Sequence, residues 1–110
     1  MIYIKDESEL KLSGLSVVKF YLDVCNPCKR LDTILKKMES EFTNINFYSM
    51  NVDNFVSFAK KYEIKTVPTL IFFDGTKNVG KVAGLMGTEF YRSEFKKFAN
   101  KGESMSITPS

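Results

Sequence analysis

The chain has 110 residues, of which 44% are hydrophobic and 26% charged, and its formal net charge is +3. This length and composition are those of one globular domain with a single core. The sequence contains no histidine, which excludes Ser-His and Cys-His nucleophile pairs and the HExxH metal site. The lysines are scattered and form no basic stripe interleaved with aromatic residues, so we expect no nucleic-acid partner.

The beginning of the chain predicts a short strand over residues 1–4 and a short helix over 6–12, capped by Asp6 or Ser8. This segment lacks the basic start and apolar core of a secretory signal. No apolar run approaches the roughly 18 residues of a membrane span. We therefore expect a cytoplasmic, reducing location and no contact with a membrane.

A predicted central strand and a long amphipathic helix flank the only two cysteines, Cys25 and Cys28. Residues 17–22 are apolar or aromatic except for Lys19, which is typical of a strand covered on both faces. Pro27 suits the first turn of the helix that follows. That helix carries one apolar stripe at helical spacing, made of Leu31, Ile34, Leu35, Met38 and Phe42.

The second half of the chain predicts two more helices and three more strands. In order these are a strand over 46–52, a helix over 55–61, strands over 69–73 and 78–83, and a helix over 89–100. Asn54 and Thr88 are the expected helix caps, and Asp74-Gly75 is a hairpin turn signal. The last helix offers aromatic side chains to the core, namely Phe90, Tyr91, Phe95 and Phe98. The polar residues 101–110 are expected to be largely disordered.

The two cysteines form a C-x-x-C pair at the predicted junction of strand and helix. Unpaired N–H groups at a helix N-terminus stabilise a nearby anion, so Cys25, which precedes the helix, gains thiolate character. Such a pair can close a small disulfide or stay as a dithiol. A zinc or iron–sulfur site needs more ligands than one chain offers, so it would require a dimer that shares Cys25 and Cys28. We expect no metal and no bound cofactor, only a redox-active Cys25–Cys28 disulfide.

Three motifs in order resemble the thioredoxin family over about residues 1–100. These are Cys25-Asn26-Pro27-Cys28-Lys29, Val67-Pro68-Thr69, and Asp74-Gly75 followed by Lys81-Val82-Ala83-Gly84-Leu85. The resemblance implies an α/β thioredoxin fold in a single domain over 1–110. Its mixed sheet would have five strands in the order 1-3-2-4-5, flanked by about four helices. It also implies a cis Val67–Pro68 bond against the cysteine pair.

The resemblance also assigns roles to individual residues. Cys25 would be the nucleophile and Cys28 the resolving thiol, and a proline at Pro27 accompanies reducing behaviour. Pro68 would keep metal off the cysteines, and Val67 would pair its backbone with the substrate chain. An apolar docking rim would consist of Val24, Val67, Ala83 and Gly84.

The chain departs from the family pattern at positions around the site. Val24 replaces a tryptophan, and Asn26 replaces a glycine. Lys19 stands where the family carries a buried aspartate, and Ser49 where a lysine often partners it. Thr33 replaces the proline that kinks the long helix. We expect Lys19 to be electrostatically coupled to the cysteine pair; the alternative is that its ammonium group reaches water away from the site.

The sequence thus predicts a monomeric protein-disulfide reductase that cycles Cys25 and Cys28 between dithiol and disulfide. Its partners would be disulfide-containing proteins and a flavin-dependent, NADPH-consuming thioredoxin reductase, with roles in electron transport and cell redox homeostasis. One alternative is a glutaredoxin-like or isomerase-like variant, although the Gly-Gly pair typical of glutaredoxins is missing. Another is a redox-silent docking subunit built on the same fold.

Overall fold

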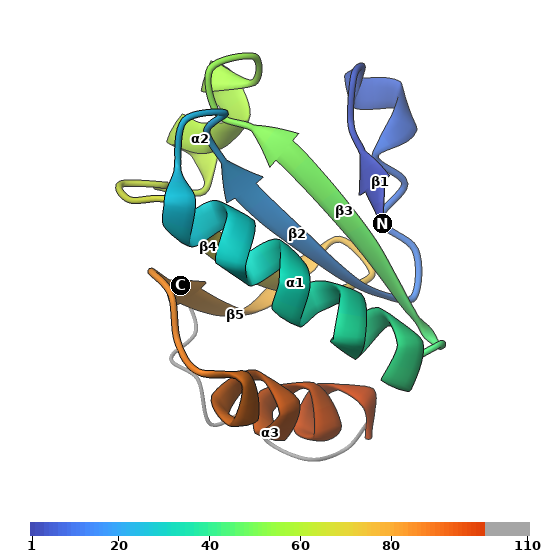
Figure 1. Cartoon of the computed structure of the whole chain (residues 1–110). Coiled ribbons are helices and arrows are strands. Elements are labelled where there is room, and N and C mark those ends of the chain that lie inside the picture. The colour runs from blue at the N-terminus through green and yellow to red at the C-terminus, as the bar shows by residue number, and fades with distance from the viewer. Residues whose placement is uncertain (101–110) are drawn as a thin grey trace.

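The computed structural model describes residues 1–100 and contains a sheet flanked by helices (Figure 1). In chain order the elements are β1 (Ile2–Tyr3), the 3-10 helix η1 (Glu7–Glu9), β2 (Leu15–Tyr21), α1 (Asn26–Glu41), β3 (Ile45–Asn51), α2 (Val56–Lys61), β4 (Thr69–Asp74), β5 (Lys77–Ala83) and α3 (Thr88–Ala99). The tail predicted over 101–110 lies outside the described residues.

The five strands form one mixed sheet in the order β1-β3-β2-β4-β5. β3 runs parallel to both β1 and β2, while β4 runs antiparallel to β2 and β5. The β4–β5 turn contains Gly75 at a φ of +62°, which glycine adopts without steric cost. The predicted strand order is confirmed. β2 is the central strand of the sheet, and the chain passes from its carboxyl end directly to the cysteines at the start of α1.

Helices cover both faces of the sheet, and each face has its own apolar cluster. Val17 of β2 packs with α1 and α3 residues such as Leu35 and Phe95, while its neighbour Val18 packs on the other face with Phe55. Successive side chains of a strand point to opposite faces, so a run covered on both sides is apolar throughout. Lys19 shares its face with Val17 and therefore lies on the face that α1 covers.

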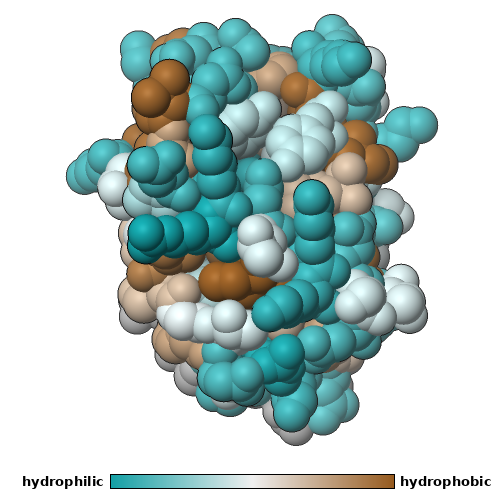
Figure 2. All heavy atoms as spheres, viewed as in Figure 1, coloured by the Kyte–Doolittle hydropathy of each residue, from teal (hydrophilic) through white to brown (hydrophobic). Residues whose placement is uncertain are grey.

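α1 is a continuous helix of 16 residues whose inner stripe is buried at Leu31, Leu35 and Met38. Thr33, which replaces the family's kinking proline, has its hydroxyl 3.5 Å from the carbonyl oxygen of Lys29. The opposite side of the helix faces solvent, and Figure 2 shows mainly hydrophilic side chains over this face of the molecule. Helix α1 is therefore amphipathic and covers the central strand with its apolar side.

Three details of the helices differ from the sequence prediction. The predicted helix over 6–12 is a 3-10 turn, although Asp6 does cap it through a capping box. α2 begins after Phe55, which is its N-cap residue and has no side-chain oxygen to cap the helix, while the Asn54 backbone N–H donates to the carbonyl oxygen of Asn51 at 3.1 Å. Thr88 is the first residue of α3 rather than its cap, which is Gly87. Residues 1–100 thus contain three α-helices and this turn rather than four full helices.

The inner face of α3 also differs at one position. Tyr91, Phe95 and Phe98 are buried at helical spacing, whereas Phe90 is among the exposed large hydrophobic residues. Phe90 falls about 100° around the helix from Tyr91, outside the stripe that meets the sheet. Within residues 1–100, no helix is long and apolar enough to cross a membrane.

Candidate active site

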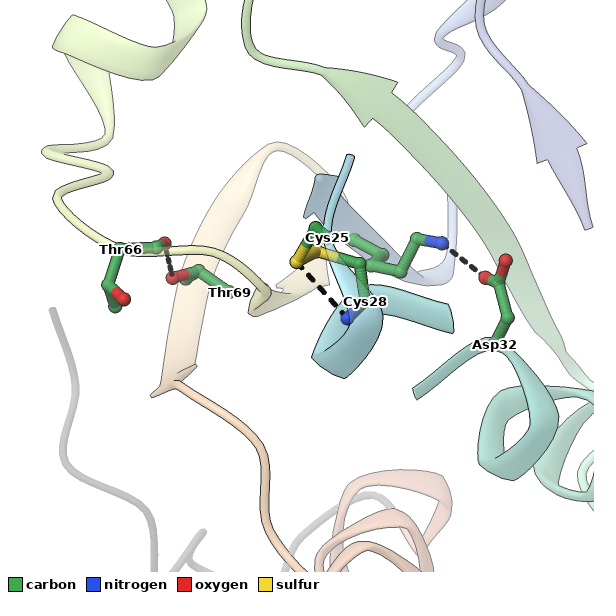
Figure 3. Close-up of a disulfide and its surroundings, with 6 residues drawn as sticks. Cys25, Cys28, Asp32, Thr66 and Thr69 are labelled. Atoms are coloured by element: carbon green, nitrogen blue, oxygen red, sulfur yellow. Dashed lines mark hydrogen bonds and ion pairs between the residues drawn. A yellow bond between two sulfur atoms is a disulfide. The ribbon is translucent and has the colours of Figure 1, made fainter. Parts of the chain in front are cut away.

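The two cysteines lie at the amino-terminal end of α1, joined by a disulfide (Figure 3). Their Cα atoms are 5.3 Å apart. Cys25 is the N-cap residue in an extended conformation, and Cys28 lies in the first turn with Pro27 between them. Cys28 is only 2% exposed, whereas Cys25 is half-buried. Cys25 is therefore the more accessible sulfur, as the sequence predicts for a nucleophile.

One backbone N–H of α1 points at the Cys25 sulfur. The Cys28 backbone N–H donates to Cys25 Sγ at an N···S distance of 3.2 Å. The first turn of α1 contains no acidic residue, so no nearby side-chain carboxylate in that turn opposes the positive end of the helix dipole. In the dithiol state, this N–H and the helix dipole would stabilise a Cys25 thiolate over the thiol.

The loop before β4 lies beside the cysteines because Thr69 pairs with Phe20 at the carboxyl end of β2. The Val67–Pro68 bond is cis, as the resemblance implies. The Thr69 hydroxyl donates to the carbonyl oxygen of Thr66 at 2.7 Å (Figure 3). The Gly84 N–H donates to the carbonyl oxygen of Pro68 at 2.8 Å. The loop is thus held from within and from the segment after β5.

The residues of the predicted docking rim lie in the segments that surround the disulfide. Val24, directly before Cys25, is 96% exposed. Val67 and Gly84 are half-buried, and Ala83 is exposed at the end of β5. Thr69 pairs with Ala83, which places the segment after β5 next to the Pro68 loop.

Lys19 is the least expected residue near the site, since its side chain is 1% exposed within the sheet. Its ammonium group forms an ion pair with Asp32 of α1, drawn as a dashed line in Figure 3. It also lies 4.7 Å from the ring centroid of Tyr21 and 5.4 Å from that of Tyr3. The alternative that this ammonium reaches water is therefore wrong.

The four residues form a polar cluster, Tyr3–Lys19–Tyr21–Asp32, under α1. The Tyr3 hydroxyl donates to Asp32 Oδ2 at 2.7 Å. The register places Tyr3, Ser49 and Lys19 in one row across the sheet. Burial lowers the pKa of Lys19, and the bond and charge of Asp32 oppose that shift. Burial, followed by the bond to Asp32, raises the pKa of Tyr3. The cluster therefore holds one cation and one anion between β1, β2 and α1.

Sequence reasoning identified Lys19 but missed its partner. Asp32 lies four residues after Cys28 on α1, and residues at that spacing are neighbours on a helix, with Cβ atoms about 5–6 Å apart. The β2 position that carries an aspartate in the family pattern here carries the cation, and the carboxylate comes from α1 instead of a strand. Asp32 is the one acidic residue between Cys28 and Met38, but its spacing from Lys19 does not mark it as the partner.

A second missed residue fixes the segment before Cys25. Buried Asn51, at the end of β3, donates from its side-chain amide to the Asp23 carboxylate at 3.1 Å. Its side-chain oxygen accepts from the Asp53 N–H at 2.8 Å. Asn51 therefore ties the loop that carries Val24 and Cys25 to the neighbouring strand. Among residues 1–100 no group of three or more acidic or cysteine side chains is arranged to hold a metal ion.

Comparison with known proteins gives a consistent picture. A family model described as thioredoxin matches residues 5–100. A thioredoxin of Chlamydia pneumoniae is 34% identical over 87 residues, which are 79% of this chain and 85% of that protein. Thioredoxin-1 of Saccharomyces cerevisiae is 35% identical over 78 residues, 71% of this chain and 76% of that protein. A solved mutant thioredoxin from Halobacterium salinarum has a TM-score of 0.80 at 24% identity and covers 90% of both chains.

Proposed function

The chain belongs to the thioredoxin family, and from that membership we propose how its cysteine pair works and which partners it serves. The protein is a thiol–disulfide oxidoreductase that reduces protein disulfides. The observation that carries the mechanism is the Cys28 N–H, 3.2 Å from Cys25 Sγ at the N-terminus of α1. It supports Cys25 as the attacking thiolate and buried Cys28 as the resolving thiol.

Reduction takes two exchange steps. The Cys25 thiolate attacks one sulfur of a substrate disulfide, forms a mixed disulfide and releases the other substrate sulfur as a thiolate. Cys28 loses its proton and attacks Cys25 Sγ, which closes the Cys25–Cys28 disulfide and releases the second substrate thiolate. Two electrons pass from the dithiol to the substrate, and the two released thiolates take up protons.

The docking rim and the site-shaping residues act on the substrate before chemistry. Val24, Val67, Ala83 and Gly84 would contact the polypeptide that carries the disulfide, and the backbone of Val67 would pair with it. Asn26 and Pro27 are exposed in the first turn of α1 and complete the surface around Cys25. These contacts would select an extended segment with an accessible disulfide rather than a small disulfide such as that of glutathione.

Lys19 influences the cysteines through Asp32 in this proposal. The ion pair has little net charge, so its field at the sulfurs is weak while both members are charged. Removal of Lys19 alone would leave an unpaired Asp32 carboxylate one helical turn from Cys28, which disfavours thiolates. Lys19 would thus keep the thiol pKa low by neutralising Asp32.

The oxidised pair must be reduced again, and a flavin-dependent thioredoxin reductase that uses NADPH would supply the electrons. A pair that reduces other disulfides must itself be kept in the dithiol state, which a reducing compartment favours, and this supports the cytoplasm as its location. Cell fractionation with an antibody against the chain tests the location; recovery in a secreted or membrane fraction would contradict it.

We expect the protein to reduce insulin disulfides in two assays. With dithiothreitol as donor, it should accelerate insulin reduction. With thioredoxin reductase, insulin and NADPH, it should drive NADPH oxidation in proportion to insulin disulfides consumed. The first assay tests disulfide reduction itself, and the second tests the reductase as partner.

The control assay replaces the reductase with glutathione and glutathione reductase. Turnover in that assay alone would identify a glutaredoxin-like variant. No turnover with any donor would indicate a redox-silent docking subunit. The first result would overturn thioredoxin reductase as the electron donor, and the second would overturn disulfide reduction itself.

A further inference from the structure

Tyr91 is an aromatic residue of α3 whose hydroxyl bonds the chain segment between β5 and α3. The residue is 0% exposed and belongs to the core cluster on the α1–α3 face. Its Oη accepts the Met86 backbone N–H at 3.1 Å and donates to the carbonyl oxygen of Gly84 at 3.3 Å. One hydroxyl therefore pairs two backbone groups that flank Leu85.

This segment continues directly from the docking rim. Ala83 forms the last ladder pair of β5, with Thr69, so the residues that follow have no strand partner. Both backbone polar groups of Gly84 are hydrogen-bonded, because its N–H donates to the Pro68 carbonyl oxygen at 2.8 Å and its carbonyl oxygen accepts from the Tyr91 hydroxyl. Gly84 has a φ of +84°, in the left-handed region that favours glycine. Tyr91 thus completes a bonded path from α3 to the cis-proline loop.

The hydroxyl is suited to this double role. A neutral tyrosine hydroxyl can donate one hydrogen bond and accept another at the same time. A tyrosine hydroxyl is neutral at physiological pH, and burial raises the pKa of Tyr91 further above its ordinary value. Met86, on the same segment, is 42% exposed and presents its side chain to solvent next to the rim. The ring is anchored in the core while the segment it holds faces the surface.

We propose that Tyr91 is a positioning residue that presets the docking rim for a protein substrate. Its hydroxyl holds Gly84 and Met86 in the conformation that receives the substrate chain, so little of this segment must be ordered on binding. Without the hydroxyl, the Gly84 carbonyl and the Met86 N–H lose their partner and the segment gains freedom. The inference rests on the proposed function, because it assigns Tyr91 to substrate docking and not to the sulfur chemistry.

The Tyr91→Phe variant tests the proposal, because it keeps the ring and removes only the hydroxyl. We expect KM for insulin to rise about five- to tenfold, the latter equal to about 1.4 kcal/mol, with kcat within about twofold of wild type. The rate with a small aromatic disulfide, which does not need the rim, should stay within about twofold of wild type.

Tyr48→Phe is the matched control. It removes a 3.1 Å bond from another buried tyrosine to the Lys11 carbonyl, on the opposite face of the sheet. Its insulin KM should not change.

An unchanged insulin KM in Tyr91→Phe would overturn the proposal, as would an equal loss of rate with both disulfides. A wild-type protein that fails to reduce insulin would instead overturn the proposed function. Amide hydrogen exchange on the wild type gives an independent test if the variant does not fold. The Met86 amide should exchange slowly although it lies outside the sheet; rapid exchange would also overturn the assignment.

Discussion

Replacing Cys25 with serine is expected to abolish disulfide reduction, lowering kcat/KM for insulin by roughly three orders of magnitude or more. Cys25 is the more exposed sulfur, and it alone accepts the Cys28 N–H at 3.2 Å. A serine hydroxyl at this position cannot form the mixed disulfide. The measurement is the rate of insulin reduction with dithiothreitol, corrected for the rate without protein.

Cys28→Ser is expected to fail at the second step and accumulate a mixed disulfide through Cys25. Buried Cys28 is 2% exposed, so in wild type it meets the substrate only after Cys25 has reacted. Mass spectrometry after incubation with a disulfide substrate reads which sulfur is linked. Trapping through Cys28 in the Cys25→Ser variant would reverse the two roles.

The second large effect concerns the stability of the Tyr3–Lys19–Tyr21–Asp32 cluster. Asp32→Ala removes the carboxylate and leaves the Lys19 ammonium buried, with its side chain 1% exposed. Breaking a buried ion pair by removing one partner costs about 3–5 kcal/mol. Because Asp32 is 25% exposed, we expect the lower end, about 3 kcal/mol off the free energy of unfolding in urea.

Lys19→Met should cost less, because it removes the buried charge and leaves the partly exposed carboxylate to water and the Tyr3 hydroxyl. A double variant that combines Lys19→Met with Asp32→Ala should be more stable than Asp32→Ala alone, since it leaves no unpaired buried charge. Glu41→Ala is the matched control, because Glu41 is also an α1 carboxylate but pairs with Arg92 at the surface. Equal destabilisation by Asp32→Ala and Glu41→Ala would contradict a buried pair.

The loss of stability in Asp32→Ala is expected to depend on pH. Lys19 has a pKa below the usual 10.5 in the folded protein, so between the two values the unfolded chain binds more protons. Stability therefore rises with pH in that interval. Loss of Asp32 removes the contact that raises the Lys19 pKa, which extends the interval downward. The destabilisation by Asp32→Ala should shrink as pH increases from about 7 toward about 10.

Cysteine alkylation in these variants tests the effect of the cluster on the thiols. Lys19→Met should raise the alkylation pKa of Cys25 by about half a unit, equal to about 0.7 kcal/mol. The double variant should restore it, because the unpaired carboxylate is gone. Unchanged alkylation profiles in both would show that Lys19 takes no part in the chemistry.

The long helix and the central strand could be predicted because their information is local, whereas the strand order was implied by the resemblance to the thioredoxin family. A doubly covered strand reads as an apolar run, and the stripe from Leu31 to Met38 has helical period. The starts of the helices were harder to predict. Asn54 and Thr88 are good cap residues, yet Asn54 lies before the N-cap of α2 and Thr88 is the first residue of α3. Their side chains alone do not fix where the first helical residue falls.

The site residues, too, could be predicted only where a sequence motif marks them. Cys25, Cys28 and Pro68 were identified because their roles follow from motifs in the sequence. The partner of Lys19 and the role of Tyr91 depend on packing between distant segments, such as α1 over β2 and α3 beside the Gly84 turn. Nothing in the spacing of Lys19 and Asp32, or of Tyr91 and Met86, distinguishes a bonded pair from two unrelated residues.

The central claim is that the Cys25–Cys28 pair itself carries electrons to protein disulfides. A single-turnover experiment tests it most directly: fully reduced protein, freed of other reductants, is mixed with a disulfide-containing protein, and both are followed by mass spectrometry. We predict that each substrate disulfide lost is matched by one new Cys25–Cys28 disulfide. Intact substrate disulfides beside a persistent Cys25–Cys28 dithiol would contradict the claim.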